Sequence, residues 1–284
     1  MNKTKIGWIG LGNMGIPMSQ QLINAGYPVT VYNRSKAKEA SLKAMGAAIA
    51  ATPKELIQHN DVVFVMVSND EAIRDIFNGK DGLLSAKAKG KIIINMSTVS
   101  PAISKEMAAL CREQGSEYLD APVSGSVKQA QEGTLVIMVG GSKAAFEQAK
   151  PVLEKLGKLA LLLGETGAGN TAKLAINTLL SFHVQGLAET VLFARQNDIK
   201  TEDILTIINN SALGNVIAKI KGDAILNDNY KAAFALKHIA KDLRLAKAEG
   251  LNSPLAKIAY QTFQEAEAQH GEEDVIAVIK QVGK

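Results

Sequence analysis

The chain has 284 residues, of which 46% are hydrophobic and 21% charged, and this is typical of a soluble globular protein of about two domains. Its net charge of +4 is spread along the chain, which argues against a nucleic-acid-binding face and fits attraction of small anionic molecules. Cys111 is the only cysteine, so the sequence excludes an intrachain disulfide and a cysteine-based metal site. We predict that Cys111 is a core residue.

The N-terminus runs almost directly into a predicted strand. This leaves no room for a signal peptide, and no charge-free apolar run of about 18 residues follows elsewhere. We therefore expect a cytoplasmic protein without a membrane partner.

A glycine-rich turn joins the first predicted strand, at residues 5–9, to a predicted helix at residues 18–23. Gly10, Gly12 and Gly15 have the G-x-G-x-x-G spacing. The first glycine allows the sharp turn, the second lets a pyrophosphate approach the backbone, and the third packs the helix on the strand. The N–H groups at the helix start would face the phosphates. We predict that all six residues of the turn contact a dinucleotide, namely Gly10, Leu11, Gly12, Asn13, Met14 and Gly15; the alternative is a purely structural turn.

The next segment indicates which dinucleotide binds. A second strand at residues 28–32 follows within one βαβ unit, as the motif requires, and it ends at Asn33-Arg34-Ser35. An NAD enzyme would carry Asp or Glu there for the ribose 2′-OH, but no carboxylate is available. Arg34 can instead form a bidentate pair with a 2′-phosphate. The sequence predicts NADP, contacted by Asn33, Arg34 and Ser35; the alternative is that Arg34 is solvated and NAD is accepted too.

Strand and helix signals alternate as far as residue 164. Continuous apolar runs predict strands buried on both faces, at residues 62–67, 92–96, 135–139 and 159–163. Helical patterns lie between the earlier strands, at residues 70–77 and 101–114. This alternation predicts an α/β fold, a Rossmann-type doubly wound parallel sheet, in a dinucleotide-binding domain of residues 1–164.

Small polar residues stand where two of these strands end. Ligands of such sheets bind outside the carboxyl ends of the strands. We therefore expect Val67, Ser68 and Thr98 to contact the cofactor near the nicotinamide ribose. The alternative is that these strand ends only supply helix caps.

The pattern becomes helical after residue 164. Residues 170–196 form one long helical segment that would span about 40 Å. Because it is largely apolar around its circumference, we expect it to be buried against a second domain or a partner chain. Residues 201–282 also read as helices. The sequence therefore predicts an all-helical domain of residues 165–284, joined to the first domain by a long helix.

Two stretches suggest substrate chemistry. Ser124, Gly125 and Ser126 follow a strand and could form an anion-binding nest for a carboxylate, or an ordinary turn. Lys173 and Asn177 share one face of the long helix, four residues apart. A lysine desolvated among Ala and Leu would have a lowered pKa suited to proton transfer; the alternative is a lysine that reaches solvent at the helix start.

A third stretch is a lysine-rich helical segment near residue 240. Lys237 and Lys241 are four residues apart, and one of them could reach the active site while the other is solvated. His238 is predicted to be structural, since no other ligand stands at a metal-binding spacing from it. We predict no metal site.

Four motifs occur together in order: the glycine turn continuing to Pro17-Met18, residues 120–125, residues 167–177, and the pair Lys241-Asp242. In this the chain resembles the β-hydroxyacid dehydrogenase family, which includes 3-hydroxyisobutyrate dehydrogenase, tartronate semialdehyde reductase and the glyoxylate/succinic semialdehyde reductases. The resemblance implies hydride transfer between NADP(H) and a small β-hydroxy acid or carboxylate-bearing aldehyde. It also implies a homodimer or homotetramer.

The resemblance implies residue roles as well. Lys173 matches the family's catalytic lysine, the general acid and base at the carbonyl oxygen. The resemblance implies that Ser124 and Gly125 bind the substrate carboxylate and that Asn177 orients the substrate. It also implies that Lys241 lies near the nicotinamide and the substrate, and that Thr98 contacts the cofactor.

Departures from the family pattern leave alternatives open. Gly125 is followed by serine rather than a second glycine, and Asn177 by threonine rather than a second asparagine. The first variant, with Asn33-Arg34-Ser35, looks more like the NADPH-dependent aldehyde reductases. The rival functions are an imine reductase, a 6-phosphogluconate dehydrogenase, which would need a much longer helical domain, and a non-catalytic NADP-binding scaffold.

Overall fold

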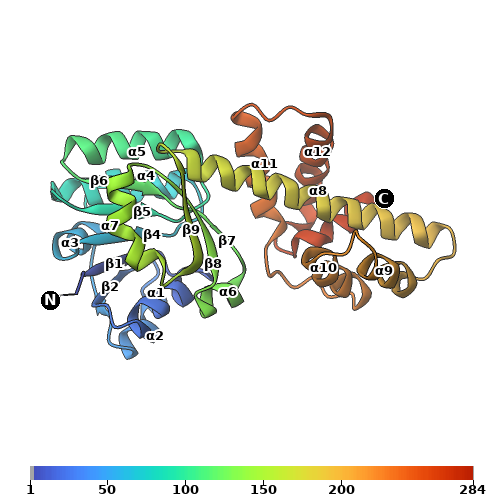
Figure 1. The fold of residues 1–284 in the computed structure, drawn as a ribbon, viewed down its shortest axis with the longest axis horizontal. Coiled ribbons are helices and arrows are strands. Elements are labelled where there is room, and N and C mark those ends of the chain that lie inside the picture. Colours follow the sequence, from blue (N-terminus) through green and yellow to red (C-terminus); the bar gives the residue numbers. More distant parts are fainter. Residues whose placement is uncertain (1–2, 284) are drawn as a thin grey trace. The chain divides into compact units, whose positions relative to one another are not determined.

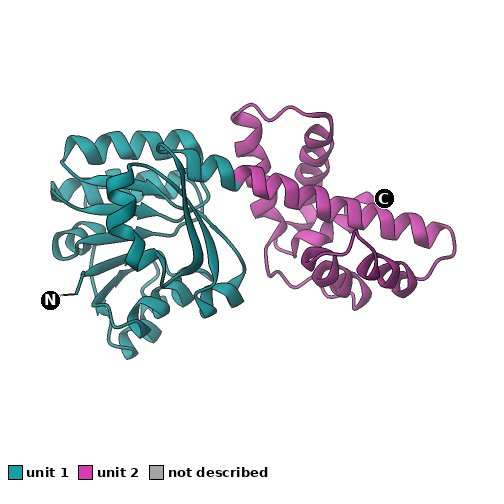
Figure 2. Cartoon of the chain, in the orientation of Figure 1, with its two compact units in different colours: residues 1–173 teal, residues 174–284 magenta. Residues whose placement is uncertain are grey.

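The computed structural model describes residues 3–283. The chain forms two compact units, residues 1–173 and residues 174–284, drawn in teal and magenta in Figure 2. The change from one unit to the other falls within a long helix, α8 (Ala168–Gln196). The predicted domain division at residue 164 stays a prediction.

The first unit is built on a sheet with strand order β3-β2-β1-β4-β5-β6-β8-β7, and β9 pairs with β8 (Figure 1). The strands are β1 (Ile6–Ile9), β2 (Val29–Tyr32), β3 (Ala48–Ile49), β4 (Val62–Val65), β5 (Ile92–Asn95), β6 (Glu117–Asp120), β7 (Val123–Ser124), β8 (Leu135–Gly140) and β9 (Gly157–Gly164). The helical elements between them are α1 (Gly15–Asn24), η1 (Lys36–Glu39), α2 (Ala40–Ala44), α3 (Pro53–His59), α4 (Asp70–Asn78), η2 (Leu83–Ala86), α5 (Pro101–Glu113), α6 (Val127–Glu132) and α7 (Lys143–Leu153).

The sheet is mainly parallel, which confirms the predicted fold class. All pairs from β3 to β6 are parallel, and so is the pair β8 and β9. One feature was not predicted: β8 runs antiparallel to β6 and β7. The connection from β7 to β8 holds only the short helix α6, so it reverses the chain instead of crossing over the sheet. Gly133 ends α6 in the left-handed conformation, with φ of 65°, and directs the chain back into β8.

Alternate residues of the central strands fill two cores, one on each face of the sheet. In β4, Val62 and Phe64 belong to one core, and Val63 and Val65 to the other. Burial of such a side chain stabilises the fold by about 1.5–3 kcal/mol, so both faces must be covered by helices. Cys111 is 2% exposed in the second core, which confirms it as a core residue, and burial raises the pKa of its thiol to about 12.

Side-chain caps fix where the two helices after β4 and β5 begin. Asn69 Oδ1 accepts the N–H of Ala72 at 2.9 Å at the start of α4. Ser100 Oγ accepts the N–H of Ile103 at 3.0 Å at the start of α5, directly before a proline. Both helices therefore start at the carboxyl edge of the sheet, as the sequence predicted.

The second unit is helical. Beyond α8 it contains α9 (Thr201–Asn210), α10 (Val216–Leu226), α11 (Leu236–Ala248), α12 (Pro254–His270), η3 (Val275–Val278) and α13 (Ile279–Val282). Its core gathers residues of α8, α11, α12 and η3. A buried pair, Lys221 Nζ and Asp274 Oδ1 at 2.7 Å, joins α10 to the segment before η3, and sequence patterns gave no sign of it.

Candidate active site

The glycine turn after β1 has the geometry that the motif predicts. A Cβ at Gly10, whose φ is +98°, would lie 2.1 Å from the Met66 carbonyl oxygen, and one at Gly15 would lie 2.0 Å from the Gly10 carbonyl oxygen. At Gly12, no heavy atom of residues 3–283 other than those of residues 11–13 comes within 4 Å of the same position. Gly10 and Gly15 are thus required by packing, whereas Gly12 leaves open space beside an exposed backbone. That a pyrophosphate occupies this space stays a prediction.

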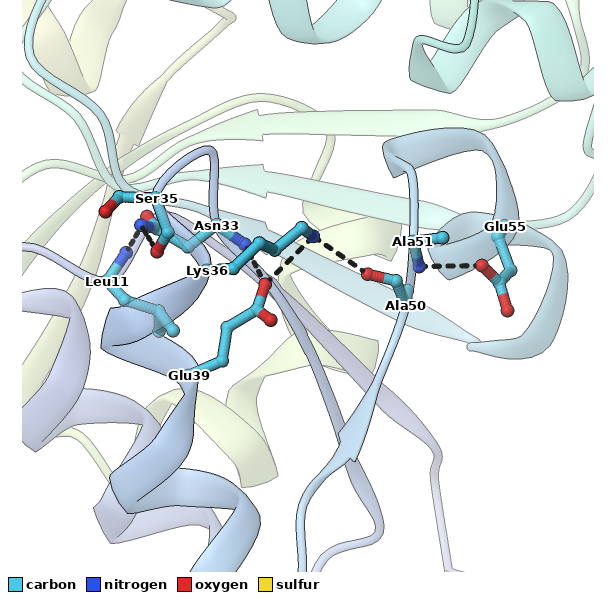
Figure 3. A network of polar contacts seen from close by, with 8 residues as sticks. All are labelled: Leu11, Asn33, Ser35, Lys36, Glu39, Ala50, Ala51 and Glu55. Carbon is cyan, nitrogen blue, oxygen red and sulfur yellow. Dashed lines mark hydrogen bonds and ion pairs between the residues drawn. The ribbon is translucent and has the colours of Figure 1, made fainter.

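The Asn33–Ser35 loop is hydrogen-bonded to this turn (Figure 3). Asn33 Oδ1 accepts the N–H of Leu11 at 2.9 Å, and Asn33 Nδ2 donates to the Ser35 carbonyl at 2.8 Å. Arg34 and Ser35 are exposed. The two segments predicted to hold a dinucleotide are therefore connected through Asn33, and the next residue, Arg34, is exposed.

One feature of this loop was missed. The sequence prediction held that no carboxylate is available at the end of β2, but Glu39 Oε1 accepts the N–H of Asn33 at 2.9 Å. Glu39 is only 6% exposed and is paired with Lys36, so it lies beneath the loop rather than on its surface. A glutamate seven residues after the end of the strand gives no recognisable signal, because the direction of its side chain depends on the short η1 turn.

The ends of β4 and β5 are tied together by buried polar contacts. Ser97 Oγ accepts the N–H of Val67 at 2.8 Å, and Asn95 Oδ1 accepts the N–H of Ser97 at 3.0 Å. Val67 and Thr98 are half-buried and Ser68 is exposed. Asn69 caps α4, so this strand end does supply a helix cap, as the alternative interpretation expected. Ser97 instead binds the backbone of the loop after β4, through the Val67 N–H.

Asp120, at the end of β6, anchors the start of α8. Its Oδ1 accepts the N–H of Gly167 at 2.7 Å and its Oδ2 accepts the N–H of Asn170 at 2.8 Å. Burial raises the pKa of this carboxyl, and the two backbone donors oppose that shift. Asn170 Oδ1 accepts the N–H of Val99 at 3.0 Å, which connects the helix start to the loop after β5. Gly169 allows the close approach, since a Cβ there would lie 2.4 Å from the Met138 carbonyl oxygen.

Lys173 lies one turn beyond Asn170 on α8 and is half-buried. Because Asp120 and Asn170 hold the first turn of the helix against the sheet, the position of the Lys173 backbone is fixed by buried contacts. Asp120 and Asn170 lie within the sequence motifs at residues 120–125 and 167–177, but no pattern in the sequence assigns either of them a role. A polar residue at a strand end, followed by a glycine-rich helix start, is the signal that could have revealed this anchor.

The Ser124–Ser126 segment only partly matches an anion nest. Ser124 ends β7 and is half-buried, and Gly125 is exposed with φ of +139°. Ser126 caps α6, and its N–H donates to Gln129 Oε1 at 2.8 Å. That amide is already occupied, so an anion here would rely on Ser124 and the Gly125 N–H.

Two predicted residues of the second unit, Asn177 and Lys241, contact Asp242. Asn177 Nδ2 donates to Asp242 Oδ2 at 2.5 Å, and Lys241 Nζ lies 3.2 Å from Asp242 Oδ1. Lys237 instead pairs with Glu272 at 2.6 Å, on the surface. His238 stacks on Phe234 with ring centroids 5.8 Å apart; burial first, and then Lys241, lower the pKa of its imidazole.

Within residues 3–283, no three His, Cys, Asp or Glu side chains gather as a metal ion would require. The helices in that same range also include none with the length and apolar character needed to cross a bilayer.

Known proteins resemble the chain over nearly its whole length. Residues 5–167 match the family model for the NAD binding domain of 6-phosphogluconate dehydrogenase, and residues 167–282 match that for NAD-binding of NADP-dependent 3-hydroxyisobutyrate dehydrogenase. The chain is 36% identical to 2-(hydroxymethyl)glutarate dehydrogenase of Eubacterium barkeri, over 97% of this chain and 94% of that protein. It is 33% identical to glyoxylate/succinic semialdehyde reductase 2 of Arabidopsis thaliana, over 99% of this chain and 80% of that protein.

A solved structure agrees. 3-Hydroxyisobutyrate dehydrogenase of Mycobacterium tuberculosis, solved with L-serine, superposes with a TM-score of 0.90 at 30% identity, over 99% of this chain and 100% of that one. Together with the glycine turn, these matches define an oxidoreductase with a nicotinamide cofactor. The chain belongs to the β-hydroxyacid dehydrogenase family, as its four motifs implied.

Proposed function

We propose that the protein interconverts a small carboxylate-bearing aldehyde and the corresponding β-hydroxy acid, with NADP(H) as cofactor and Lys173 as general acid and base. The observation that carries the proposal is the buried anchor at Asp120, which fixes the start of α8 one turn before Lys173. The relatives support the substrate class, since glyoxylate and succinic semialdehyde are both aldehydes that bear a carboxylate.

The preference for NADP rests on the loop after β2. Arg34 is exposed beside the cofactor turn, and its guanidinium can form two parallel hydrogen bonds with a 2′-phosphate. An NAD enzyme would offer a carboxylate to the 2′-OH. The carboxylate near this loop, that of Glu39, is instead buried and paired with Lys36. The family description of residues 167–282 also names an NADP-dependent enzyme.

The chemistry requires the chain to hold an anion and to move one proton. NADPH, when bound, supplies the hydride that adds to the carbonyl carbon. As the carbonyl π bond opens, Lys173 Nζ donates a proton to the oxygen, which leaves a neutral amine and an alcohol. In the opposite direction the neutral amine takes that proton. We assign the substrate carboxylate to Ser124 and Gly125, and the family resemblance assigns contact with the substrate to Asn177 and Lys241.

A panel of substrates tests the proposed function. Oxidation of NADPH at 340 nm is followed with glyoxylate, succinic semialdehyde, tartronate semialdehyde, methylmalonate semialdehyde and a cyclic imine, and each reaction is repeated with NADH. We expect turnover of one or more acid aldehydes, with kcat/KM higher for NADPH. Turnover of the imine alone would support the imine reductase, and binding of NADPH without any turnover would support the non-catalytic scaffold.

Arg34 is tested by the same assay. We expect Arg34→Ala to lower kcat/KM for NADPH by about tenfold or more, while the value for NADH changes little, because a charge-assisted bond is worth about 1.5–3 kcal/mol. Lys43→Ala, at an exposed lysine of α2, is the control and should leave both values unchanged. Equal losses with the two cofactors in Arg34→Ala would contradict the assignment.

A further inference from the structure

A buried carboxylate lies directly beneath the loop that is proposed to select the cofactor (Figure 3). Glu39 Oε1 accepts two hydrogen bonds, from the Asn33 N–H at 2.9 Å and from Lys36 Nζ at 3.1 Å. The Glu39 side chain is 7% exposed, whereas that of Lys36 is 53% exposed. The pair therefore combines a fixed, buried negative charge with a lysine that reaches in from the surface.

The direction of the Lys36 side chain is set by two further contacts. Its Nζ donates to the Ala50 carbonyl at 3.4 Å and lies 4.4 Å from the centre of the Tyr32 ring. Tyr32 is the last residue of β2, and Ala50 directly follows β3. The ammonium group is thus held at Glu39 by three contacts, while more than half of the Lys36 side chain stays exposed.

This position of Glu39 creates an electrostatic conflict for an NADP enzyme. The carboxylate is bonded to the backbone of Asn33, one residue before Arg34. A 2′-phosphate bound by Arg34 carries up to two negative charges, and a neighbouring uncompensated carboxylate would repel it. A charge in a poorly solvated position is also screened less than one in water.

We propose that Lys36 and Glu39 together determine the preference for NADP without touching the cofactor. Glu39 is a positioning residue: it fixes the Asn33 backbone, and Asn33 in turn holds the Leu11 N–H of the glycine turn. Lys36 neutralises the carboxylate that does this, so the loop keeps its anchor without a net negative charge beside the 2′-phosphate. The inference rests on the proposed use of NADP.

The proposal predicts different effects on dinucleotide binding for substitutions at Lys36 and at Glu39. Lys36→Met keeps the aliphatic stem but removes the charge, so it leaves Glu39 uncompensated and should weaken NADPH binding by about tenfold, with less than about threefold loss for NADH. Glu39→Gln keeps an acceptor for the Asn33 N–H and removes the negative charge, so NADPH binding should stay within about threefold of wild type. Glu39→Leu removes the acceptor and should weaken both dinucleotides alike.

The decisive variant is the double substitution Lys36→Met/Glu39→Gln. If Lys36 acts by neutralising Glu39, removing both charges restores NADPH binding to within about threefold of wild type, which is strong coupling between the two sites. If Lys36 instead bound the phosphate itself, the double variant would bind NADPH as weakly as Lys36→Met.

Dinucleotide binding is measured with the full-length protein by quenching of Trp8. It is the only tryptophan in the chain, and its Nε1 donates to the Gly10 carbonyl in the glycine turn at 3.0 Å. The probes are NADPH and NADH, and thermal unfolding of each variant without cofactor shows whether it is folded. Glu55→Gln, which removes a partly buried carboxylate on α3, and Lys43→Met serve as matched controls and should change neither affinity.

The outcomes separate this inference from the proposed function. The inference is supported if the double variant regains NADPH affinity, if kcat is unchanged, and if only Lys36→Met lowers the ratio of NADPH affinity to NADH affinity. The inference is overturned if Lys36→Met leaves the ratio of NADPH affinity to NADH affinity unchanged, or if adding Glu39→Gln to Lys36→Met does not restore NADPH affinity. Neither result would overturn the NADP assignment. A wild-type protein that binds NADH more tightly than NADPH would overturn the NADP assignment itself.

Discussion

Replacement of Asp120 by alanine tests the buried anchor of α8. The substitution removes two bonds to a carboxylate, at 2.7 Å and 2.8 Å, and leaves the N–H groups of Gly167 and Asn170 without that acceptor. A hydrogen bond to a charged group contributes about 1.5–3 kcal/mol, so the gross loss is about 3–6 kcal/mol. Relief of the burial that raises the carboxyl pKa offsets part of it. We expect a net loss of about 3 kcal/mol, and a Tm lower by about 6–12 °C for a unit of this size.

The assay is urea unfolding followed by circular dichroism, together with amide hydrogen exchange at residues 167 and 170. Asp120→Asn retains one acceptor oxygen and should lose about half as much free energy of unfolding. Asp75→Ala, at an exposed position of α4, is the control and should stay within about 0.5 kcal/mol of wild type. A loss below about 1 kcal/mol in Asp120→Ala, or unchanged exchange at the two amides, would refute the anchor.

Three other substitutions follow from the same contacts. Gly10→Ala should abolish dinucleotide binding by Trp8 quenching and lower the Tm, because its Cβ would lie 2.1 Å from the Met66 carbonyl oxygen; normal binding would contradict the turn geometry. Lys221→Met should lower the free energy of unfolding by about 3–5 kcal/mol in urea, because Asp274 keeps a buried charge, and a loss under about 1 kcal/mol would speak against the pair. Burial lowers the pKa of His238, so the folded protein binds fewer protons than the unfolded chain and loses stability as the pH falls from 6.5 through that lowered pKa. In urea titrations from pH 7 to 5, the free energy of unfolding should therefore fall less steeply in His238→Gln than in wild type. Parallel curves for the two proteins would contradict this prediction.

The architecture was predictable because its main signals are local. Strands such as Val62–Val65 are buried on both faces and read as continuous apolar runs, and the caps at Asn69 and Ser100 mark helix starts within a residue or two. The antiparallel course of β8 was not predictable in this way. It depends on whether the connection through α6 reverses or crosses the sheet, and the strand Leu135–Gly140 is equally apolar in both cases.

The candidate site was predictable where a motif specifies the backbone. The motif specifies a tight turn at Gly10 and Gly15 and an open position at Gly12, and the structure has both features. The contact of this turn with a dinucleotide stays a prediction. Contacts between distant side chains left no such signal. Glu39 reaches Asn33 through a short 3-10 turn, and Asp120 reaches the helix start 47 residues later in the chain. These partners are chosen by tertiary packing, so their roles emerge only from the folded chain.

The most direct test of the proposed chemistry is the turnover of Lys173→Ala with NADPH and the acid aldehyde that wild type reduces best. General acid catalysis contributes about 10²–10⁴ in rate, so kcat should fall at least about 100-fold while quenching of Trp8 by NADPH stays unchanged. Lys150→Ala, at an exposed lysine of α7, should keep wild-type turnover. Turnover of Lys173→Ala within about tenfold of wild type would contradict the assignment of Lys173 as the proton donor.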